Sequence, residues 1–224
     1  MPCMGWAAFC LSARRNLLSV QWLFFDVGYT LINEDQVWRR RFVEQAFMPE
    51  TAELGLSADE IRQEVIRSSI ERKPQYRTFV QKYALTHAAP YRHELEEPYA
   101  DACFVLKELS QRYRLGIIAN QTDGLRERLA SWGLLAFFSA VVSSWDHQIM
   151  KPDKRLFEIA LEEACCTPQE AVMIGDRLDN DVEPAGALGM QTVWIRQGFG
   201  AFQTPEGILP DYTINSLSQL LELY

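Results

Sequence analysis

The sequence lacks the cysteine patterns of zinc sites and of disulfide-stapled secreted domains. Its five cysteines stand at positions 3, 10, 103, 165 and 166, without a CxxC pair or a metal-ligand spacing. Two of them are adjacent, an arrangement rarely used for structural disulfides. This pattern indicates that the cysteines are reduced thiols, and we predict that the protein is cytoplasmic.

Positive charge and long apolar runs are also scarce. The 224 residues include 22 Lys and Arg against 30 Asp and Glu, which gives a net charge of −8. An acidic chain is a poor partner for nucleic acids and anionic membranes, and no apolar stretch of membrane-spanning length is free of charges. We therefore expect no nucleic acid and no membrane as a partner. The sequence carries no readable signal of oligomeric state.

The first nineteen residues do not have the pattern of a folded segment. A mildly apolar run over 4–13 precedes Arg14 and Arg15. A secretory signal has the opposite order, with its positive charges first, and the run is too short to span a bilayer. We predict that residues 1–19 are an N-terminal extension and that the fold begins near Val20.

What the chain does contain is a strong strand signal near its start. Four bulky apolar residues, Trp22 to Phe25, lead directly into Asp26. Such a run, bounded by a turn signal, is typical of a strand buried on both faces of a parallel sheet. Open α/β sheets bind ligands outside the carboxyl ends of their strands, which is where Asp26 is expected. The alternative is an aspartate that caps a turn before a helix.

Residues 33–97, which we refer to as the helical insert, show no confident strand signal. Apolar residues at helical spacing predict a first helix over 34–47. Ser57-Ala58-Asp59-Glu60 is a capping box that opens a second helix. A third helix is expected around 76–83, and a short helical piece within 89–97.

From Pro98 onward the pattern alternates between strands and helices. Buried strands are expected at 115–119, 140–142, 171–174, 192–195 and 212–214. Strands that alternate with helices of this kind predict a parallel sheet with right-handed crossovers. The predicted fold class is therefore α/β, a Rossmann-like parallel sheet core with a small all-helical cap insert. Residues 20–32 and 98–224 would form the core, and residues 33–97 the cap.

Polar residues stand at the expected strand ends. They are Asp26, Asn120, the loop that leads to Lys151, and the acidic run with Asp176 and Asp181. Because the carboxyl ends of parallel strands share one edge of a sheet, these side chains can converge. Three carboxylates and one ammonium suit a Mg²⁺ site that handles a phosphoryl group, and an aspartate can itself be the nucleophile. Taken singly, Lys-Pro could be a helix start and the acidic run a turn with a cap.

In this order, Asp26, Asn120, Lys151-Pro152 and Gly175-Asp176-x-x-x-x-Asp181 resemble the motifs of the haloacid dehalogenase superfamily. The similarity covers about residues 20–224. An insert between the first and second motifs is similar to the helical C1 cap of subfamily I. The resemblance implies a Mg²⁺-dependent hydrolase, and within it a phosphatase that acts on a small phosphorylated metabolite through an aspartyl phosphate.

The same resemblance implies roles for individual residues. Asp26 resembles the nucleophile and a Mg²⁺ ligand. The backbone carbonyl of Gly28 and the carboxylate of Asp176 match further metal ligands, and Asp181 matches a second acidic ligand or a hydrogen-bonding support. Lys151 resembles the lysine that bridges the nucleophile and the phosphate.

Two positions depart from the phosphatase pattern. Phosphatases of the family carry a second Asp two residues after the nucleophile, as general acid and then base, and here Gly28 stands there. Such help is worth ~10²–10⁴ in rate, so we expect slow turnover of alkyl esters and a gain from Gly28→Asp. Asn120 is similar to the family's phosphate-binding asparagine, but Ala119 replaces the hydroxyl residue before it. Thr122 is interpreted as a helix cap rather than a substitute.

These departures leave other interpretations open. Gly28 and Ala119 also fit a catalytically weak or non-catalytic binding or regulatory protein, or a phosphotransferase with slow water attack. A phosphonatase-like enzyme would need a lysine from the helical insert, where only Lys73 and Lys82 are available. The arginines of the insert are interpreted as a solvated helix face, and His147 as a surface histidine rather than a replacement acid.

Overall fold

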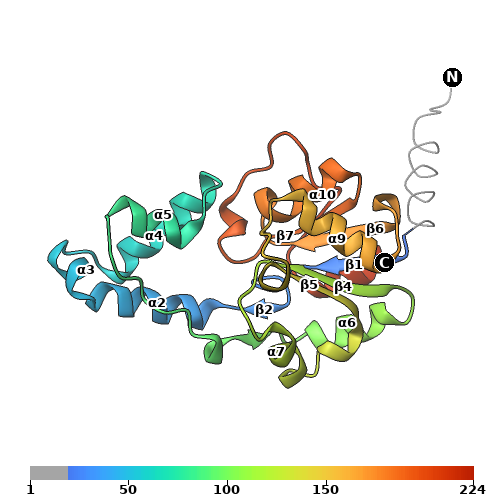
Figure 1. The fold of residues 1–224 in the computed structure, drawn as a ribbon, viewed down its shortest axis with the longest axis horizontal. Helices are drawn as coiled ribbons and strands as arrows, with labels where there is room; N and C mark the ends of the chain where they lie inside the picture. The colour runs from blue at the N-terminus through green and yellow to red at the C-terminus, as the bar shows by residue number, and fades with distance from the viewer. Residues whose placement is uncertain (1–19) are drawn as a thin grey trace.

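The computed structural model describes residues 20–224, and the predicted extension over 1–19 lies outside them. Its centre is one six-stranded sheet in which every neighbouring pair is parallel (Figure 1). The strands are β1 (Trp22–Phe25), β4 (Arg114–Ala119), β5 (Phe138–Ser143), β6 (Ala171–Gly175), β7 (Gln191–Ile195) and β8 (Tyr212–Ile214). The predicted α/β fold with a parallel sheet is confirmed. No helix in this described part combines the length and apolar character needed to cross a membrane.

Strand β1 lies inside the sheet, whose order is β5-β4-β1-β6-β7-β8. It pairs with β4 on one side and β6 on the other along its whole length. The chain moves outward from β1 through β4 to β5 and then crosses back to β6, so the direction of winding reverses at β1. Open α/β sheets bind ligands at such a reversal, outside the carboxyl ends of the strands. The residue that follows β1 is therefore well placed for chemistry.

The side chains of β1 alternate between the two faces of the sheet. Leu23 and Phe25 pack in one hydrophobic cluster with α6, α7 and α11, and Trp22 and Phe24 pack in the opposite cluster with α9 and α10. Burial on both faces explains the unbroken apolar run of this strand. The covering helices are α6 (Ala102–Ser110), α7 (Leu125–Ser131), α9 (Lys154–Ala164), α10 (Glu183–Leu188) and α11 (Leu220–Leu223).

The helical insert lies to one side of the sheet (Figure 1). Ser57 opens its second long helix with the predicted capping box, in which the Ser57 and Glu60 side chains each accept the other residue's backbone N–H. The α-helices of the insert are α2 (Asp35–Phe47), α3 (Pro49–Glu53), α4 (Ala58–Ile70) and α5 (Gln75–Lys82). The short piece expected within 89–97 is a 3₁₀ turn, η1 (His93–Leu95).

A small antiparallel ladder that the sequence pattern does not predict closes the base of the insert. Strand β2 (Ile32–Asn33) pairs with β3 (Glu97–Pro98). Each strand has only two residues, so neither leaves a periodic hydrophobic signal. The insert is therefore not purely helical at its two ends. Its assignment as a separate cap domain stays a prediction.

Two helix starts also differ from what the sequence predicts, which is Asp123 as the cap of one helix and Lys151-Pro152 as the start of another. The residue that caps α7 is Gly124, at a positive φ of 78° that suits glycine, and Asp123 only accepts the N–H of that glycine. Helix α9 begins at Lys154 behind the capping side chain of Asp153, not at Lys151-Pro152. Lys151 is consequently free to lie in the loop at the edge of the sheet.

One core side chain anchors the insert. Phe199, in the loop after β7, packs edge-on against Trp38 with the ring centroids 5.0 Å apart, and it also contacts the rings of Tyr29 and Phe42. The hydroxyl of Ser69 donates to the Phe199 carbonyl at 2.8 Å. The insert and the core thus share one aromatic cluster.

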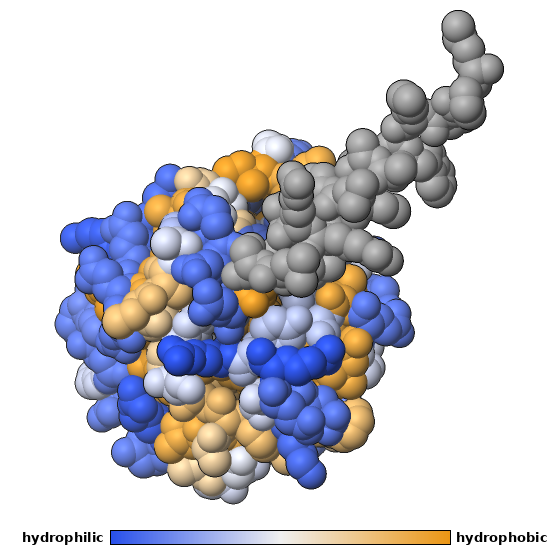
Figure 2. Space-filling model, turned by 90° about the vertical axis from the view of Figure 1, so that its right-hand side faces the viewer, coloured by the Kyte–Doolittle hydropathy of each residue, from blue (hydrophilic) through white to orange (hydrophobic). Residues whose placement is uncertain are grey.

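Two regions of the surface differ in shape and in the kinds of residue that they present. The end of the core turned away from the insert presents interspersed hydrophilic and apolar residues (Figure 2). Between the insert and the core, residues of the insert and of the loops that follow the strands line a cleft of ≈ 950 Å³. The polar residues singled out in the sequence lie in this cleft.

Candidate active site

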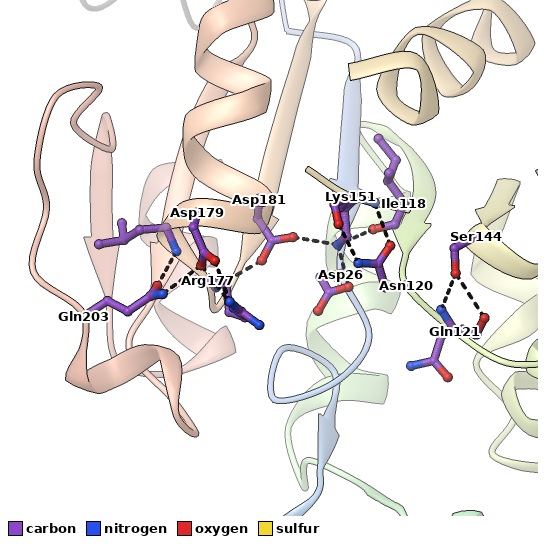
Figure 3. A network of polar contacts seen from close by, with 11 residues as sticks. Asp26, Ile118, Asn120, Gln121, Ser144, Lys151, Arg177, Asp179, Asp181 and Gln203 are labelled. Atoms are coloured by element: carbon purple, nitrogen blue, oxygen red, sulfur yellow. Dashed lines mark hydrogen bonds and ion pairs between the residues drawn. The ribbon is translucent and has the colours of Figure 1, made fainter. Parts of the chain in front are cut away.

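The ammonium group of Lys151 lies at the centre of the site (Figure 3). Its Nζ donates to Asp26 Oδ1 at 2.7 Å, to Asp181 Oδ1 at 2.6 Å and to the Ile118 carbonyl at 2.8 Å. These bonds use all three donors of the ammonium, as a buried charge requires. Burial opposes the charge of Lys151, but attraction to Asp181 and Asp26 outweighs it and raises the pKa of the lysine.

The three predicted carboxylates converge beside this lysine. Asp26, Asp176 and Asp181 each offer one oxygen, and these oxygens lie within 4.8 Å of one another. Asp26 directly follows β1 and is tied to β6 by its backbone N–H. Asp176 follows β6, and Asp181 returns to the same edge through η4 (Leu178–Val182), a π-helical turn. The Arg177 N–H donates to Asp181 Oδ2 at 3.0 Å.

The carboxylates of this cluster are not fully neutralised. No hydrogen bond or ion pair from the described part of the chain reaches the carboxylate of Asp176. Burial, together with repulsion from Asp181 and Asp26, raises the pKa of Asp176 well above its ordinary value. Burial also raises the pKa of Asp181, to about 6, although Lys151 lowers it. Hard carboxylate oxygens with surplus negative charge fit a divalent cation such as Mg²⁺.

Asn120 fixes the loop that carries Lys151. Its Nδ2 donates to the Lys151 carbonyl at 2.9 Å, and its Oδ1 accepts the Lys151 N–H at 2.7 Å. The amide therefore positions the lysine, and its role in phosphate binding stays a prediction. The methyl group of Ala119 is fully buried in the core, and the Thr122 hydroxyl contacts Nε2 of His93 instead of capping a helix.

Comparison with known proteins agrees with this geometry. The profile of a family described as haloacid dehalogenase-like hydrolase matches residues 23–195. The chain belongs to this family. A pyrophosphatase PpaX from Listeria welshimeri is 31% identical over 218 residues, which cover 90% of this chain and 94% of the relative. The family predicted from the motifs is confirmed.

Other relatives of this haloacid dehalogenase-like hydrolase match it less completely. A glyceraldehyde 3-phosphate phosphatase from Methanocaldococcus jannaschii is 36% identical over 135 residues, covering 58% of this chain and 57% of the relative. Several curated relatives are likewise matched over only 50–58% of their length. A solved HAD phosphatase from Thermococcus onnurineus has a TM-score of 0.64 and 26% identity, with 91% of this chain and 97% of that chain covered.

Glu34 is a residue of the candidate site that the sequence motifs do not contain. It is only 9% exposed and lines the cleft, where it accepts hydrogen bonds from Trp38 Nε1 at 2.9 Å and from the Tyr91 hydroxyl at 2.6 Å. Burial raises the pKa of Glu34 to about 7, against those two bonds, which lower it. Glu34 precedes α2 without capping it. A glutamate where Ser, Thr, Asp or Asn is preferred was the available signal.

Glu34 also occupies the space beside Gly28. The φ of Gly28 is not positive, so the turn itself does not require glycine. A Cβ built on Gly28 would instead lie 2.5 Å from Glu34 Oε1, far inside a non-bonded contact. Gly28→Asp alone would therefore push the Glu34 carboxylate out of its present position and away from Trp38 and Tyr91. That substitution changes two carboxyl groups at once, and the expected gain in alkyl-ester turnover stays a prediction.

The remaining candidate residues fall into two groups, those that line the cleft and those that do not. His147 is partly exposed, pairs with a glutamate of α9 at 3.8 Å and does not line the cleft. Lys73 and Lys82 pair with glutamates of the insert, and neither lines the cleft. Among the arginines of the insert, Arg41 and Arg72 do line it, so these two are not part of a wholly solvated face.

Proposed function

We propose that this protein is a Mg²⁺-dependent phosphatase that acts on a small phosphorylated compound through an aspartyl phosphate on Asp26. The proposal is carried by one observation, the double contact of Lys151 Nζ with Asp26 and Asp181 at the wall of an open cleft. This contact fixes the orientation of the Asp26 carboxylate and leaves the neighbouring Asp176 carboxylate available to a cation.

Each residue has a defined task in this reaction. Asp26 attacks phosphorus and the ester P–O bond breaks; water then attacks the phosphorus of the aspartyl phosphate, and Asp26 is released. Lys151 holds the nucleophile and offsets negative charge on the transferred phosphoryl group. Asp26, the Gly28 carbonyl, Asp176 and Asp181 would hold Mg²⁺, which supplies further charge stabilisation when bound.

The names of the relatives favour a small substrate. They include a glyceraldehyde 3-phosphate phosphatase, a pyrimidine 5'-nucleotidase and a phosphoserine phosphatase. The substrates in these names are all small compounds that carry a phosphate. In this chain the insert contributes Trp38, Arg41 and Tyr91 to the lining of the cleft. Aromatic faces and the guanidinium of Arg41 suit a small anionic compound.

The alternative activities receive less support. A phosphonatase-like reaction needs an amine from the insert, and both of its lysines are ion-paired away from the cleft. A non-catalytic role gives no reason for a buried Lys151 between two carboxylates, which is a costly arrangement to maintain. Release of phosphate from a panel of small phosphate esters, measured with Mg²⁺ and with EDTA, tests the proposal directly. Phosphate release that EDTA leaves unchanged would contradict it.

The metal assignment predicts a specific loss in Asp176→Asn. We expect Mg²⁺ affinity, measured by titration calorimetry, to fall at least ~10-fold, because a carboxylate ligand is replaced by a neutral amide. Asp179→Asn is the matched control, since Asp179 lies in the same loop but its carboxylate is already paired with Arg177 and Gln203. Equal affinity in Asp176→Asn and in the unchanged protein would remove the metal assignment.

A further inference from the structure

We propose that Glu34 is the general acid and base of this site, delivered from the start of α2 in place of a side chain at position 28. The inference rests on the proposed phosphatase function and deepens it. It gives a role to a buried carboxylate that no motif contains, and it explains how a site with glycine at position 28 can turn over esters with poor leaving groups.

The carboxylate of Glu34 occupies the space of the missing side chain. A Cβ on Gly28 would lie 2.5 Å from Glu34 Oε1, 3.0 Å from its Cδ and 3.3 Å from its Oε2. The carboxyl group of Glu34 therefore lies against the point where an aspartate side chain at position 28 would begin. A side chain at position 28 would force the Glu34 carboxylate out of its present position, and glycine there leaves the room that this carboxylate uses.

The fold of the loop after β1 brings Glu34 to this place. The Val27 carbonyl accepts the N–H groups of Leu31 at 2.9 Å and Ile32 at 3.0 Å, and Gly28 forms an isolated bridge with Ile32. The chain thus folds back on itself immediately after Asp26. Glu34, two residues beyond Ile32, therefore lies beside Gly28 and lines the same cleft as Asp26.

The hydrogen bonds of Glu34 suit a group that gains and loses a proton. Trp38 Nε1 donates to Oε2, which fixes the plane of the carboxyl group. The Tyr91 hydroxyl lies 2.6 Å from Glu34 Oε1 and 3.1 Å from Glu96 Oε1. Tyr91 can donate to Glu34 when that group is ionised, or donate to Glu96 and accept from Glu34 when it is protonated. In both states the Tyr91 hydroxyl and Glu34 Oε1 keep each other as hydrogen-bond partners.

The proton balance of the reaction closes with this one group. As Asp26 attacks phosphorus and the ester P–O bond breaks, the Glu34 carboxyl gives its proton to the departing oxygen. The Glu34 carboxylate then takes a proton from the water that attacks the phosphorus of the aspartyl phosphate. The P–O bond to Asp26 breaks, and both carboxyl groups return to their starting states.

Glu34→Gln tests the inference through the leaving group. Gln keeps an oxygen for Trp38 and an amide for Tyr91, so the fold should be retained. Phenyl phosphate and p-nitrophenyl phosphate differ in how much their leaving oxygen needs a proton. In rapid-mixing experiments with Mg²⁺, the first turnover of phenyl phosphate should slow by about 10²–10³-fold, and that of p-nitrophenyl phosphate by less than about 10-fold. Equal slowing of both esters, or of neither, would overturn the role.

Relocation of the carboxyl group gives an independent test. The double variant Gly28→Asp with Glu34→Ala removes the collision and places a carboxylate where Glu34 now lies. Its matched control is Gly28→Ala with Glu34→Ala, which differs only in lacking that carboxylate. We expect the first to turn over phenyl phosphate at least ~10-fold faster than the second. Equal rates in two folded double variants would count against the role of Glu34.

The same experiments separate this inference from the proposed function. Asp26→Asn should abolish product release from both esters in every background, whatever group serves as the acid. If Asp26→Asn kept full activity, the proposed function would fail. If Asp26→Asn were inactive while Glu34→Gln slowed both esters alike, the function would stand and only the assignment of Glu34 would fall.

Discussion

Turnover of p-nitrophenyl phosphate is expected to fall by at least ~10⁴-fold in Asp26→Asn, because an amide cannot attack phosphorus and no covalent intermediate forms. The substitution should leave the fold intact. An amide oxygen can still accept the hydrogen bond from Lys151 Nζ, and Asp26 is only part-buried at the end of β1. Steady-state rates and the melting temperature together check both expectations.

Asp59→Asn is the control for a lost aspartate charge. Asp59 lies exposed in the first turn of α4, away from the cleft. Its loss should leave turnover within about two-fold and stability within about 0.5 kcal/mol. If Asp26→Asn and Asp59→Asn had similar rates, the aspartyl phosphate route would be wrong, and Asp26 would serve only to hold Lys151.

Much of the fold was predictable because its signals are local. The apolar run of β1 is unbroken since the strand is buried on both faces, and the capping box at Ser57 needs only four consecutive residues. Asp26, Lys151 and Asp176 could be placed together from the strand pattern alone, because the carboxyl ends of parallel strands share one edge of the sheet. The antiparallel pairing of β2 with β3 was not predictable. Each strand has only two residues, too few for a periodic hydrophobic pattern, and the whole insert separates them in the sequence.

Glu34 shows why the site was only partly predictable. In the sequence it is one charged residue before a helix that is rich in charged residues. Its place depends on the hydrogen bonds that fold the chain back after Val27 and on Tyr91, far away in the chain. Gly28 stands out in the sequence as a departure from the family pattern, but the space that it leaves beside Glu34 is a property of the tertiary structure.

Lys151→Met is expected to lower the free energy of unfolding by about 3–5 kcal/mol near pH 8 in EDTA. The reason is electrostatic, because Asp181 and Asp26 would lose the cation that both of them contact, and Asp181 is almost fully buried. Lys154→Met makes the same chemical change on the exposed first residue of α9, and its effect should stay within about 0.5 kcal/mol. Urea unfolding of the three proteins measures the difference.

The pH dependence of this loss identifies its cause. With Lys151 present, the folded-state pKa of Asp181 is about 6, above its ordinary value, so the native state holds a proton that the unfolded chain releases. Stability from this group is full below the ordinary pKa and declines as the pH rises through about 6. Without Lys151 the folded-state pKa rises further, so the decline continues toward pH 8, by up to about 1.4 kcal/mol per pH unit for one proton. The gap between Lys151→Met and the unchanged protein should therefore be small near pH 5 and widen toward pH 8. A gap of the same size at both pH values would show that lost packing around the lysine, and not the unpaired carboxylates, destabilises the variant.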